Sequence, residues 1–373
     1  MKATWCAGLV SLLWLAASGS ALAANGVVGP GNCDEGGFDD VLATVDGSGG
    51  GTITFNCGTA TIPFTFYKQV ANAVTIDGGG TITFDGQNAS AFFQVYASAN
   101  VTLRRLTLRR GAFSAAHAIE NFGKLRLDRV LVRDSVSGGA TVQNYGTLRI
   151  KDSTFSGNAN TATDFGGDGG AIAHDGTSLV VEASTFVGNS AGRHGAAIFS
   201  KAPLTIENAT FTANNAAGGG AAVYQTGSGS SSIDHATIAG NTAVFGGGIY
   251  KEGSASATLT ISRSIIADNT GGNCDGVLLT GGYNLWSGST GCGFTGPGDG
   301  SGDPQLGALA ANGGATQTRM PGSGSVAINR IPSGQCSLHA DQRGGGRPSG
   351  AGCDSGSVEV GAVLDVIFQD DFD

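Results

Sequence analysis

The chain has 373 residues, of which 65 are glycine and only 13% are charged, and its formal net charge is −9. This much glycine without a collagen period, together with so little charge, excludes helical and coiled-coil proteins and is typical of a chain with many tight turns. The acidic balance argues against general nucleic-acid binding, so no nucleic-acid partner is expected.

The N-terminus is typical of an exported protein. Lys2 precedes an apolar run over residues 9–17, and Ala21-Leu22-Ala23 has the small-x-small pattern of a cleavage site. We therefore predict a signal peptide over residues 1–23. Its apolar run is too short to cross a bilayer, and no later stretch reaches the roughly 18 apolar residues that a span needs. No transmembrane span is expected.

Six cysteines follow the predicted signal peptide, and an even number in an exported chain indicates disulfides. Their spacings fit neither a zinc site nor a redox CxxC motif, and no metal site is expected. We predict three locally closed pairs that tie together the two ends of the molecule: Cys33–Cys57, Cys274–Cys292 and Cys336–Cys353.

Residues 24–73 are predicted to form an N-terminal cap. The segment from Asn32 to Leu42 favours a short helix, and Thr52 to Phe55 alternates as a strand does. A cap of this kind covers the strand edge at the end of a repeat stack, which otherwise recruits other chains.

Residues 74–295 repeat one pattern, with a period of about 25 residues. Each copy contains short strand-like runs split by glycine and asparagine, and none shows the 3.6-residue period of a helix. We predict an all-β fold, a right-handed parallel β-helix of about eight coils. The inward anchors are Ile76, Leu103, Leu127, Ile150, Val181, Ile206, Ile233 and Ile261. An asparagine ladder is expected at one turn, formed by Asn158, Asn189, Asn214, Asn241 and Asn269.

Residues 296–360 are a different kind of sequence, followed by an acidic tail over residues 361–373. Their motifs are Asp303-Pro304, Asn312-Gly313-Gly314, Asp341-Gln342-Arg343-Gly344 and Cys353-Asp354. These motifs resemble the closing domain of bacterial secreted β-helix proteins of the choice-of-anchor type, and the repeats resemble those of polymorphic outer-membrane proteins.

The resemblance implies a bacterial protein that is secreted or associated with the outer membrane or cell surface, and it carries no agreed set of catalytic residues. Val326, Asn329 and Ser357 depart from the usual pattern. The ending Ile367 to Asp373 resembles a short sorting tag, and the alternative is a frayed acidic end.

Residues 101–151 are basic within this acidic chain. They hold ten Arg and Lys residues against three acidic residues, a net charge of +7. Arg126 and Arg149 each precede an anchor, so they should point outward about 5 Å apart on adjacent coils. With Lys151 they form a candidate dock for an acidic polysaccharide, because arginine binds carboxylate or sulfate bidentately. The alternative is a set of solvated strand exteriors.

A second candidate lies in the third strand of the repeat. Phe199, Tyr224 and Tyr250 align on consecutive copies and are expected to face outward, where their rings can stack on sugars. The alternative is a ladder covered by a loop or by the C-terminal domain. Beside it runs a polar row suited to sugar hydroxyls: Asn121, Asn144, His174, Ser200, Gln225 and Lys251.

No catalytic constellation is evident, and the catalytic residues are unknown. The acidic residues Asp164, Asp168, Asp175, Glu182 and Glu207 are not expected to share a column, so no facing carboxylate pair of a glycosidase is predicted. We predict a monomeric secreted or cell-surface protein that binds a polysaccharide or another surface component, or mediates adhesion, without a cofactor. The alternative is a polysaccharide lyase acting on an acidic glycan, for which calcium is expected.

Overall fold

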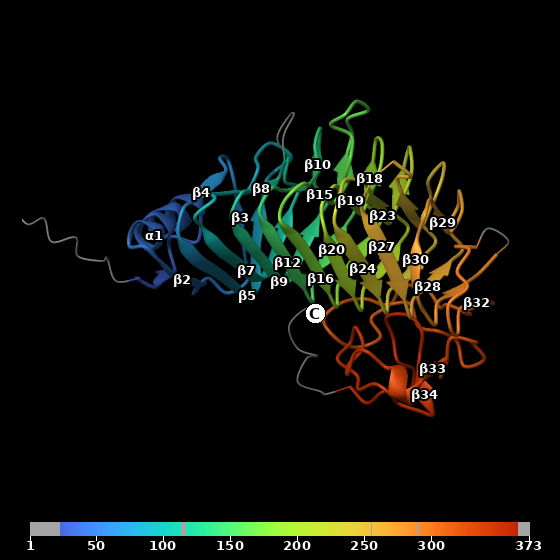
Figure 1. Ribbon diagram of the computed structural model, residues 1–373. Helices are drawn as coiled ribbons and strands as arrows, with labels where there is room; N and C mark the ends of the chain where they lie inside the picture. Colours follow the sequence, from blue (N-terminus) through green and yellow to red (C-terminus); the bar gives the residue numbers. More distant parts are fainter. Residues whose placement is uncertain (1–22, 113–116, 255, 289–290, 365–373) are drawn as a thin grey trace, which may run out of the picture.

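The strands wind into a right-handed parallel β-solenoid of about ten coils (Figure 1). The computed structural model describes residues 23–112, 117–254, 256–288 and 291–364. Almost all of the predicted signal peptide and the end of the acidic tail therefore lie outside the described residues. No helix in the described part is long and apolar enough to cross a membrane.

A 19-stranded sheet holds the first two strands of every coil. The first strands are β2 (Gly50–Phe55), β5 (Ala73–Asp85), β7 (Asn100–Arg109), β9 (Lys124–Arg133), β12 (Thr147–Lys151), β16 (Ser178–Glu182), β20 (Leu204–Glu207), β24 (Ser230–Asp234), β27 (Thr258–Ser262) and β30 (Leu279–Gly282). The second strands are β3 (Ala60–Pro63), the later halves of β5, β7 and β9, then β13 (Thr154–Ser156), β17 (Thr185–Val187), β21 (Thr210–Thr212), β25 (Thr237–Ala239), β28 (Ile265–Ala267), β31 (Leu285–Trp286) and β32 (Gly300–Ser301).

A nine-stranded sheet holds the third strands, and a four-stranded sheet runs along one turn. The third strands are β4 (Lys68–Val70), β6 (Phe93–Val95), β8 (Ile119–Asn121), β11 (Val142–Asn144), β15 (Ile172–His174), β19 (Ile198–Ser200), β23 (Val223–Gln225), β26 (Ile249–Lys251) and β29 (Cys274–Asp275). The turn strands are β10 (Val136–Ser137), β14 (Ala159–Asn160), β18 (Ser190–Ala191) and β22 (Asn215–Ala216).

The coil count exceeds the eight predicted because two coils lack the recognisable repeat. At the N-terminal end, β2 to β4 already complete a coil, and Ile53 pairs in register with the first predicted anchor, Ile76. At the other end, β30 and β31 pair with β27 and β28 after the repeat has decayed in sequence.

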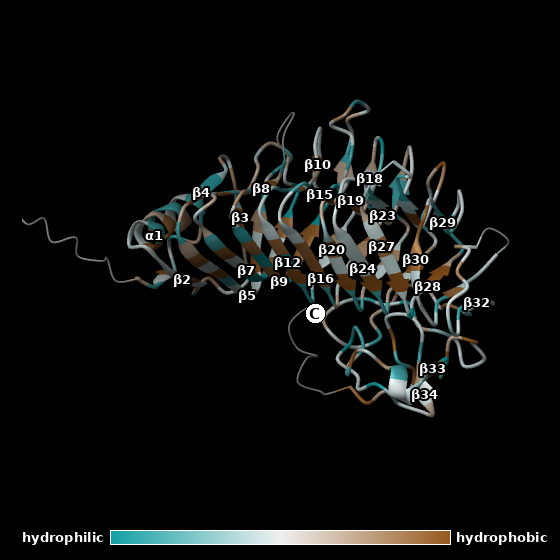
Figure 2. Cartoon of the chain, viewed as in Figure 1, coloured by the Kyte–Doolittle hydropathy of each residue, from teal (hydrophilic) through white to brown (hydrophobic). Residues whose placement is uncertain are grey.

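The predicted inward columns form the core, which follows the apolar stripes in Figure 2. All eight anchors are fully buried. Beside them, Phe155, Phe186 and Phe211 stack with ring centroids 4.9 Å apart and planes within 5° of parallel. Like residues stack on like because each coil repeats the same inward position directly above the last.

The asparagine ladder is confirmed. Each side-chain amide donates to the carboxamide oxygen of the next asparagine, and the four distances from Asn158 to Asn269 are 2.9, 2.9, 2.8 and 2.9 Å. The same oxygens accept from backbone N–H groups, such as that of Asn189 at 3.1 Å. The ladder thereby satisfies buried polar groups at five successive turns.

The predicted capping helix is present as α1 (Glu35–Gly47), slightly later than expected. Asp34 caps it by accepting from the N–H of Gly37 at 2.9 Å. Phe38 is fully buried against the first coils, 5.0 Å from the ring of Phe84. A short strand, β1 (Gly26–Val28), pairs with β2, so helix and strand together close this end of the core.

All three predicted disulfides are present: Cys33–Cys57, Cys274–Cys292 and Cys336–Cys353. The last of them lies in the C-terminal region, residues 303–364, which packs beside the later coils (Figure 1). That region holds little regular structure beyond β33 (Ile331–Pro332), a short 3-10 helix (Ser333–Gln335) and β34 (Gly352–Cys353).

The C-terminal region docks on a column of threonines that β17, β21 and β25 present outward. Thr185 donates to the carbonyl of Gln317 at 2.6 Å, and Thr210 donates to the Gln342 side chain at 2.6 Å. The N–H of Ser357 donates to Thr237 at 3.0 Å. All three threonines are buried, so the contact is polar yet closed to solvent.

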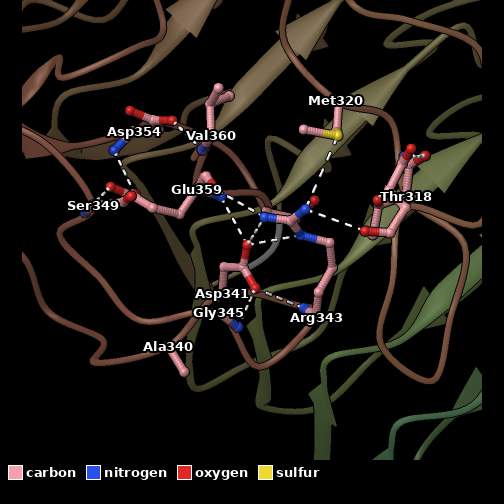
Figure 3. A network of polar contacts seen from close by, with 12 residues as sticks. Thr318, Met320, Ala340, Asp341, Arg343, Gly345, Ser349, Asp354, Glu359 and Val360 are labelled. Carbon is pink, nitrogen blue, oxygen red and sulfur yellow. Dashed lines mark hydrogen bonds and ion pairs between the residues drawn. The ribbon is translucent and has the colours of Figure 1, made fainter. Parts of the chain in front are cut away.

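Within the region, two buried ion pairs organise the loops. Figure 3 shows the pair of Arg343 and Asp341. Arg343 holds Asp341 through two hydrogen bonds of 3.0 and 2.7 Å, and it also donates to the Glu359 carbonyl. Arg347 donates to the Glu359 carboxylate at 3.0 Å. These contacts fix residues 341–359 without a sizeable apolar core of their own.

Candidate functional site

The predicted basic strip exists, and its register is as expected. Arg126 and Arg149 face each other on β9 and β12. However, the arginines of residues 101–151 are paired with carboxylates, several of which come from coils outside that segment. The pairs are Arg105–Asp77, Arg110–Asp85, Arg126–Asp128, Arg133–Asp134 and Arg149–Glu182. The carboxylates of Asp77, Asp85 and Glu182 thereby offset part of the excess positive charge of residues 101–151.

Two of these carboxylates make stability depend on pH. Burial raises the pKa of Asp77 and Asp85, but hydrogen bonds and charge from Arg105, Arg109 and Arg110 outweigh it, so both pKa values lie below the ordinary 3.8. A lowered pKa adds stability that is present above the unfolded-state pKa and is lost as pH falls through the folded-state value.

We therefore expect the urea midpoint to fall as the pH drops below about 4. Asp85→Asn should cost about 1–3 kcal/mol near neutral pH, because Arg109 and Arg110 lose a charged acceptor. It should also flatten the acid limb of a plot of midpoint against pH. An acid limb identical to that of the parent protein would contradict the assignment.

A concave site lies where the basic strip meets the C-terminal region. The cleft encloses about 330 Å³. Its solenoid wall carries Arg149, Lys151 and Asp152, with Glu182 and Glu207 on the next two coils, and residues 340–344 form the opposite wall. Concave sites with convergent polar groups are the usual position of ligand sites.

A carboxylate column runs into this cleft, contrary to the expectation that the acidic residues share no column. Glu182 pairs in register with Glu207, and Glu207 with Asp234, on β16, β20 and β24. Each of the three directly follows an inward anchor. The column could have been found in the sequence by comparing the residue that follows each anchor. It is hard to see otherwise, because the copies differ in length.

Lys151 occupies the same column between Asp128 and Glu182. Asp128 forms an ion pair with Arg126 at 2.9 Å, and Glu182 forms one with Arg149 at 2.6 Å. Among the described residues, the ammonium group of Lys151 forms no ion pair. It is therefore the cation of the strip that is best placed to receive an anionic ligand.

The prediction that the aromatic ladder is exposed is wrong for Phe199 and Tyr224. Phe199 and Tyr224 are only 5% and 7% exposed. The ring of His194 lies 4.5 Å from that of Tyr224, and Phe245 lies 4.8 Å from Tyr250. Turns that precede the third strands thus fold over the ladder, as the covered alternative required, and burial raises the pKa of Tyr224 to about 12. Only Tyr250 keeps partial exposure.

The two halves of the sequence-predicted site also lie apart. Arg126, Arg149 and Lys151 belong to the 19-stranded sheet, whereas Phe199 and Tyr224 belong to the nine-stranded sheet. The structure therefore does not bring the predicted cations and aromatics into one site.

The model of the family described as "right handed beta helix region" matches residues 52–243. The chain belongs to this family. Among solved structures, this β-helix protein is similar to an arginine-to-alanine mutant of an alginate lyase of family PL6, at 11% identity and a TM-score of 0.28. That likeness covers 79% of this chain and 55% of the lyase, so the chain spans just over half of its length. No curated protein has a significantly similar sequence.

The polar row beside the aromatic ladder is also not the exposed surface that was predicted; its members are buried inside this β-helix protein. Asn121 donates to Asn144 at 2.6 Å, and Asn144 lies 2.8 Å from the His174 ring. These residues stand two places after an inward residue, so strand alternation turns them inward again. They form a second internal ladder, and burial lowers the pKa of His174.

The carboxyl groups in the cleft of the β-helix protein have different surroundings. Glu182 accepts two hydrogen bonds from Arg149, at 2.6 and 2.7 Å. Burial raises the pKa of Glu207, and the charges of Glu182 and Asp234 raise it further. Burial likewise raises the pKa of Asp152. A carboxyl group whose pKa is raised by burial is suited to acid–base chemistry.

The described residues contain no group of three or more His, Cys, Asp and Glu side chains arranged to hold a metal ion. Within the cleft, the guanidinium of Arg149 already binds the carboxylate of Glu182. The carboxylates of the cleft therefore do not fit a calcium site as they stand.

Proposed function

We propose that this β-helix protein is a secreted or surface-exposed bacterial protein that binds an acidic polysaccharide in the cleft between β12 and the C-terminal region. One observation carries the proposal: Lys151 lines the cleft beside Arg149 and has no ion-pair partner within the part of the chain that the structure describes. A uronate carboxylate can reach both cations, since the two side chains lie two residues apart on the same face of one strand.

The walls of the cleft support a chain-like ligand. The solenoid side is a regular stack of strands about 5 Å apart. Arg149 lines the cleft, and Arg126 lies outside this lining on the neighbouring coil. The opposite wall is held in place by hydrogen bonds between the C-terminal region and the threonine column. Little reorganisation is then needed when the ligand binds, which preserves affinity.

The test is binding of soluble alginate to the Lys151→Ala variant. We expect about tenfold weaker binding, since one charged hydrogen bond contributes about 1.5–3 kcal/mol. Lys124→Ala is the matched control, because Lys124 is exposed at the start of β9, away from the cleft. Equal affinity of the Lys151→Ala variant and the parent protein for alginate, pectate and chondroitin sulfate would contradict the proposal.

A second candidate is a polysaccharide lyase acting on the same acidic chain, favoured by the raised pKa values of Asp152 and Glu207 in the cleft. In a β-elimination, a base removes the proton α to the uronate carboxylate and a C=C bond forms. The glycosidic C–O bond then breaks, and the leaving oxygen takes a proton. Lys151 and Arg149 would offset the charge on the carboxylate.

Ultraviolet absorbance separates the two candidates. A lyase produces an unsaturated sugar that absorbs, so absorbance rises with time on alginate, pectate or chondroitin sulfate. Glu207→Gln should then abolish the rise while binding persists. A flat trace over the whole panel, with binding retained, excludes elimination and leaves the binding function.

Attachment to a surface is the remaining part of the proposal. The C-terminal region carries the Asp341–Arg343 and Cys336–Cys353 contacts, which occupy the motifs that resemble a choice-of-anchor domain. We propose that this region serves export or anchoring in a bacterium while the cleft remains open to the ligand. Comparing cell fractions of the full chain and of a chain ending at residue 302 tests this role.

A further inference from the structure

Three exposed aromatic residues form a column at the ends of strands of the nine-stranded sheet, on coils other than those of Phe199, Tyr224 and Tyr250. Tyr96, Phe122 and Tyr145 directly follow β6, β8 and β11. Backbone hydrogen bonds place them in one column: the N–H of Phe122 donates to Val95 at 2.9 Å, and that of Tyr145 donates to Asn121 at 2.8 Å.

These rings are open to solvent. Tyr96, Phe122 and Tyr145 are 38%, 40% and 42% exposed. The rings of Phe122 and Tyr145 are nearly parallel, 15° apart, with centroids separated by 5.1 Å. That separation exceeds the contact distance of directly superposed rings, so the rings overlap with an offset and each keeps part of a face accessible.

A row of hydrogen-bonding side chains runs beside the aromatic column. Gln69, Gln94 and Glu120 are in register on β4, β6 and β8. Gln69 donates to Gln94 at 3.0 Å, and Gln94 donates to Glu120 at 2.8 Å. Amide and carboxylate groups have further donors and acceptors, so the row can still bond to hydroxyl groups.

The row leads into a hollow beside the capping helix. This hollow encloses about 600 Å³ and is lined by Gln69, the exposed Phe66 and Tyr67, and carboxylates of α1 such as Asp46. Aromatic and amide groups thus continue over four successive third strands, from β4 to β11.

We propose that Tyr96, Phe122 and Tyr145, together with the Gln69–Gln94–Glu120 row, form a binding strip for an uncharged, extended polysaccharide. Its chain lies along the solenoid axis, with about one sugar ring per coil, since successive strands are about 4.8 Å apart. The C–H faces of pyranose rings pack on the aromatic rings, while their hydroxyl groups bond to the amides and to Glu120.

The charges of the strip select a neutral ligand. Glu120 and Asp175 flank Tyr145, and both raise its pKa after the effect of burial. The nearest cation along the column, Lys201, already pairs with Asp175 at 3.3 Å. An acidic polysaccharide would meet repulsion here, so the strip is distinct from the cleft at Lys151, which lies on the other sheet.

Affinity electrophoresis tests the strip, using native gels that contain hydroxyethyl cellulose, glucomannan or alginate. We expect the full chain to be retarded by at least one neutral polymer. Phe122→Ala should weaken that binding about tenfold, and the triple variant Tyr96→Ala, Phe122→Ala, Tyr145→Ala should migrate freely. Phe165→Ala is the control, since Phe165 is 91% exposed on a turn outside the column.

The alginate gel keeps this proposal separate from the acidic-glycan function. Lys151→Ala should leave retardation in the neutral gels unchanged, and Phe122→Ala should leave retardation in alginate unchanged. Migration of the parent protein that is unaffected by both neutral polymers overturns the strip, as does equal retardation of the triple variant and the parent. Circular dichroism of the variants verifies that the solenoid is intact.

Discussion

Replacing Phe186 by alanine is expected to destabilise the solenoid by about 3–5 kcal/mol. Its side chain is fully buried in the middle of the phenylalanine stack, between Phe155 and Phe211, with both centroids 4.9 Å away. The backbone on both sides is fixed by strand pairing, so the coils cannot close in on the cavity. The remaining void then adds to the lost burial of the ring.

Urea unfolding followed by circular dichroism measures this loss, with Phe165→Ala as the exposed control. Because coils contact only their neighbours, unfolding of a solenoid need not be two-state. Hydrogen exchange should therefore show the largest increase in the strands around Phe186, β13, β17 and β21. A cost below about 1 kcal/mol, the range of surface substitutions, would show that Phe186 is not held in a rigid core.

Glu359→Gln is expected to cost about 3–5 kcal/mol in the C-terminal region, because it leaves the buried guanidinium of Arg347 without its counter-charge. Both side chains are almost fully buried, at 3.0 Å from each other (Figure 3 shows the Glu359 surroundings). Glu359 also accepts from the N–H groups of Ser349 and Asp354, at 2.8 and 2.9 Å. Hydrogen exchange over residues 341–360 measures the effect.

The double variant Arg347→Met, Glu359→Gln distinguishes charge from packing. If the uncompensated guanidinium causes the loss, removing it should restore part of the stability. The solenoid itself should remain protected from exchange in both variants, since its coils are held by their own strand pairing and its core lies apart from this ion pair. A double variant that is less stable than Glu359→Gln would contradict this explanation.

The core of the solenoid could be predicted from the repeating pattern of apolar and asparagine residues in the sequence. The anchors from Ile76 to Ile261 recur every 23–31 residues, and the ladder from Asn158 to Asn269 follows the same repeat. One buried position per coil leaves little freedom in how coils stack. The three disulfides followed for a similar reason, because each pair closes a short segment at one end of the chain.

The outer surface was harder to predict, since outward residues are selected by contacts that no local spacing records. Arg149 was predicted to be a free cation, but β16 brings Glu182 beside it. The column of Glu182, Glu207 and Asp234 could have been found by comparing the residue after each anchor. Whether an outward ring is covered depends on the turns: those around His194 and Phe245 fold over Tyr224 and Tyr250, whereas Phe122 and Tyr145 stay open.

Local sequence pattern was enough to predict the solenoid and its inward columns, because burial imposes a recurring pattern on the chain, and cysteine spacing was enough to predict the disulfides. The pairing of charges, the exposure of aromatic rings and the position of the cleft depend on tertiary contacts. Those features arise where neighbouring coils meet and where residues 303–364 pack on the coils. Residues far apart in sequence come together there, and local spacing does not record their contacts.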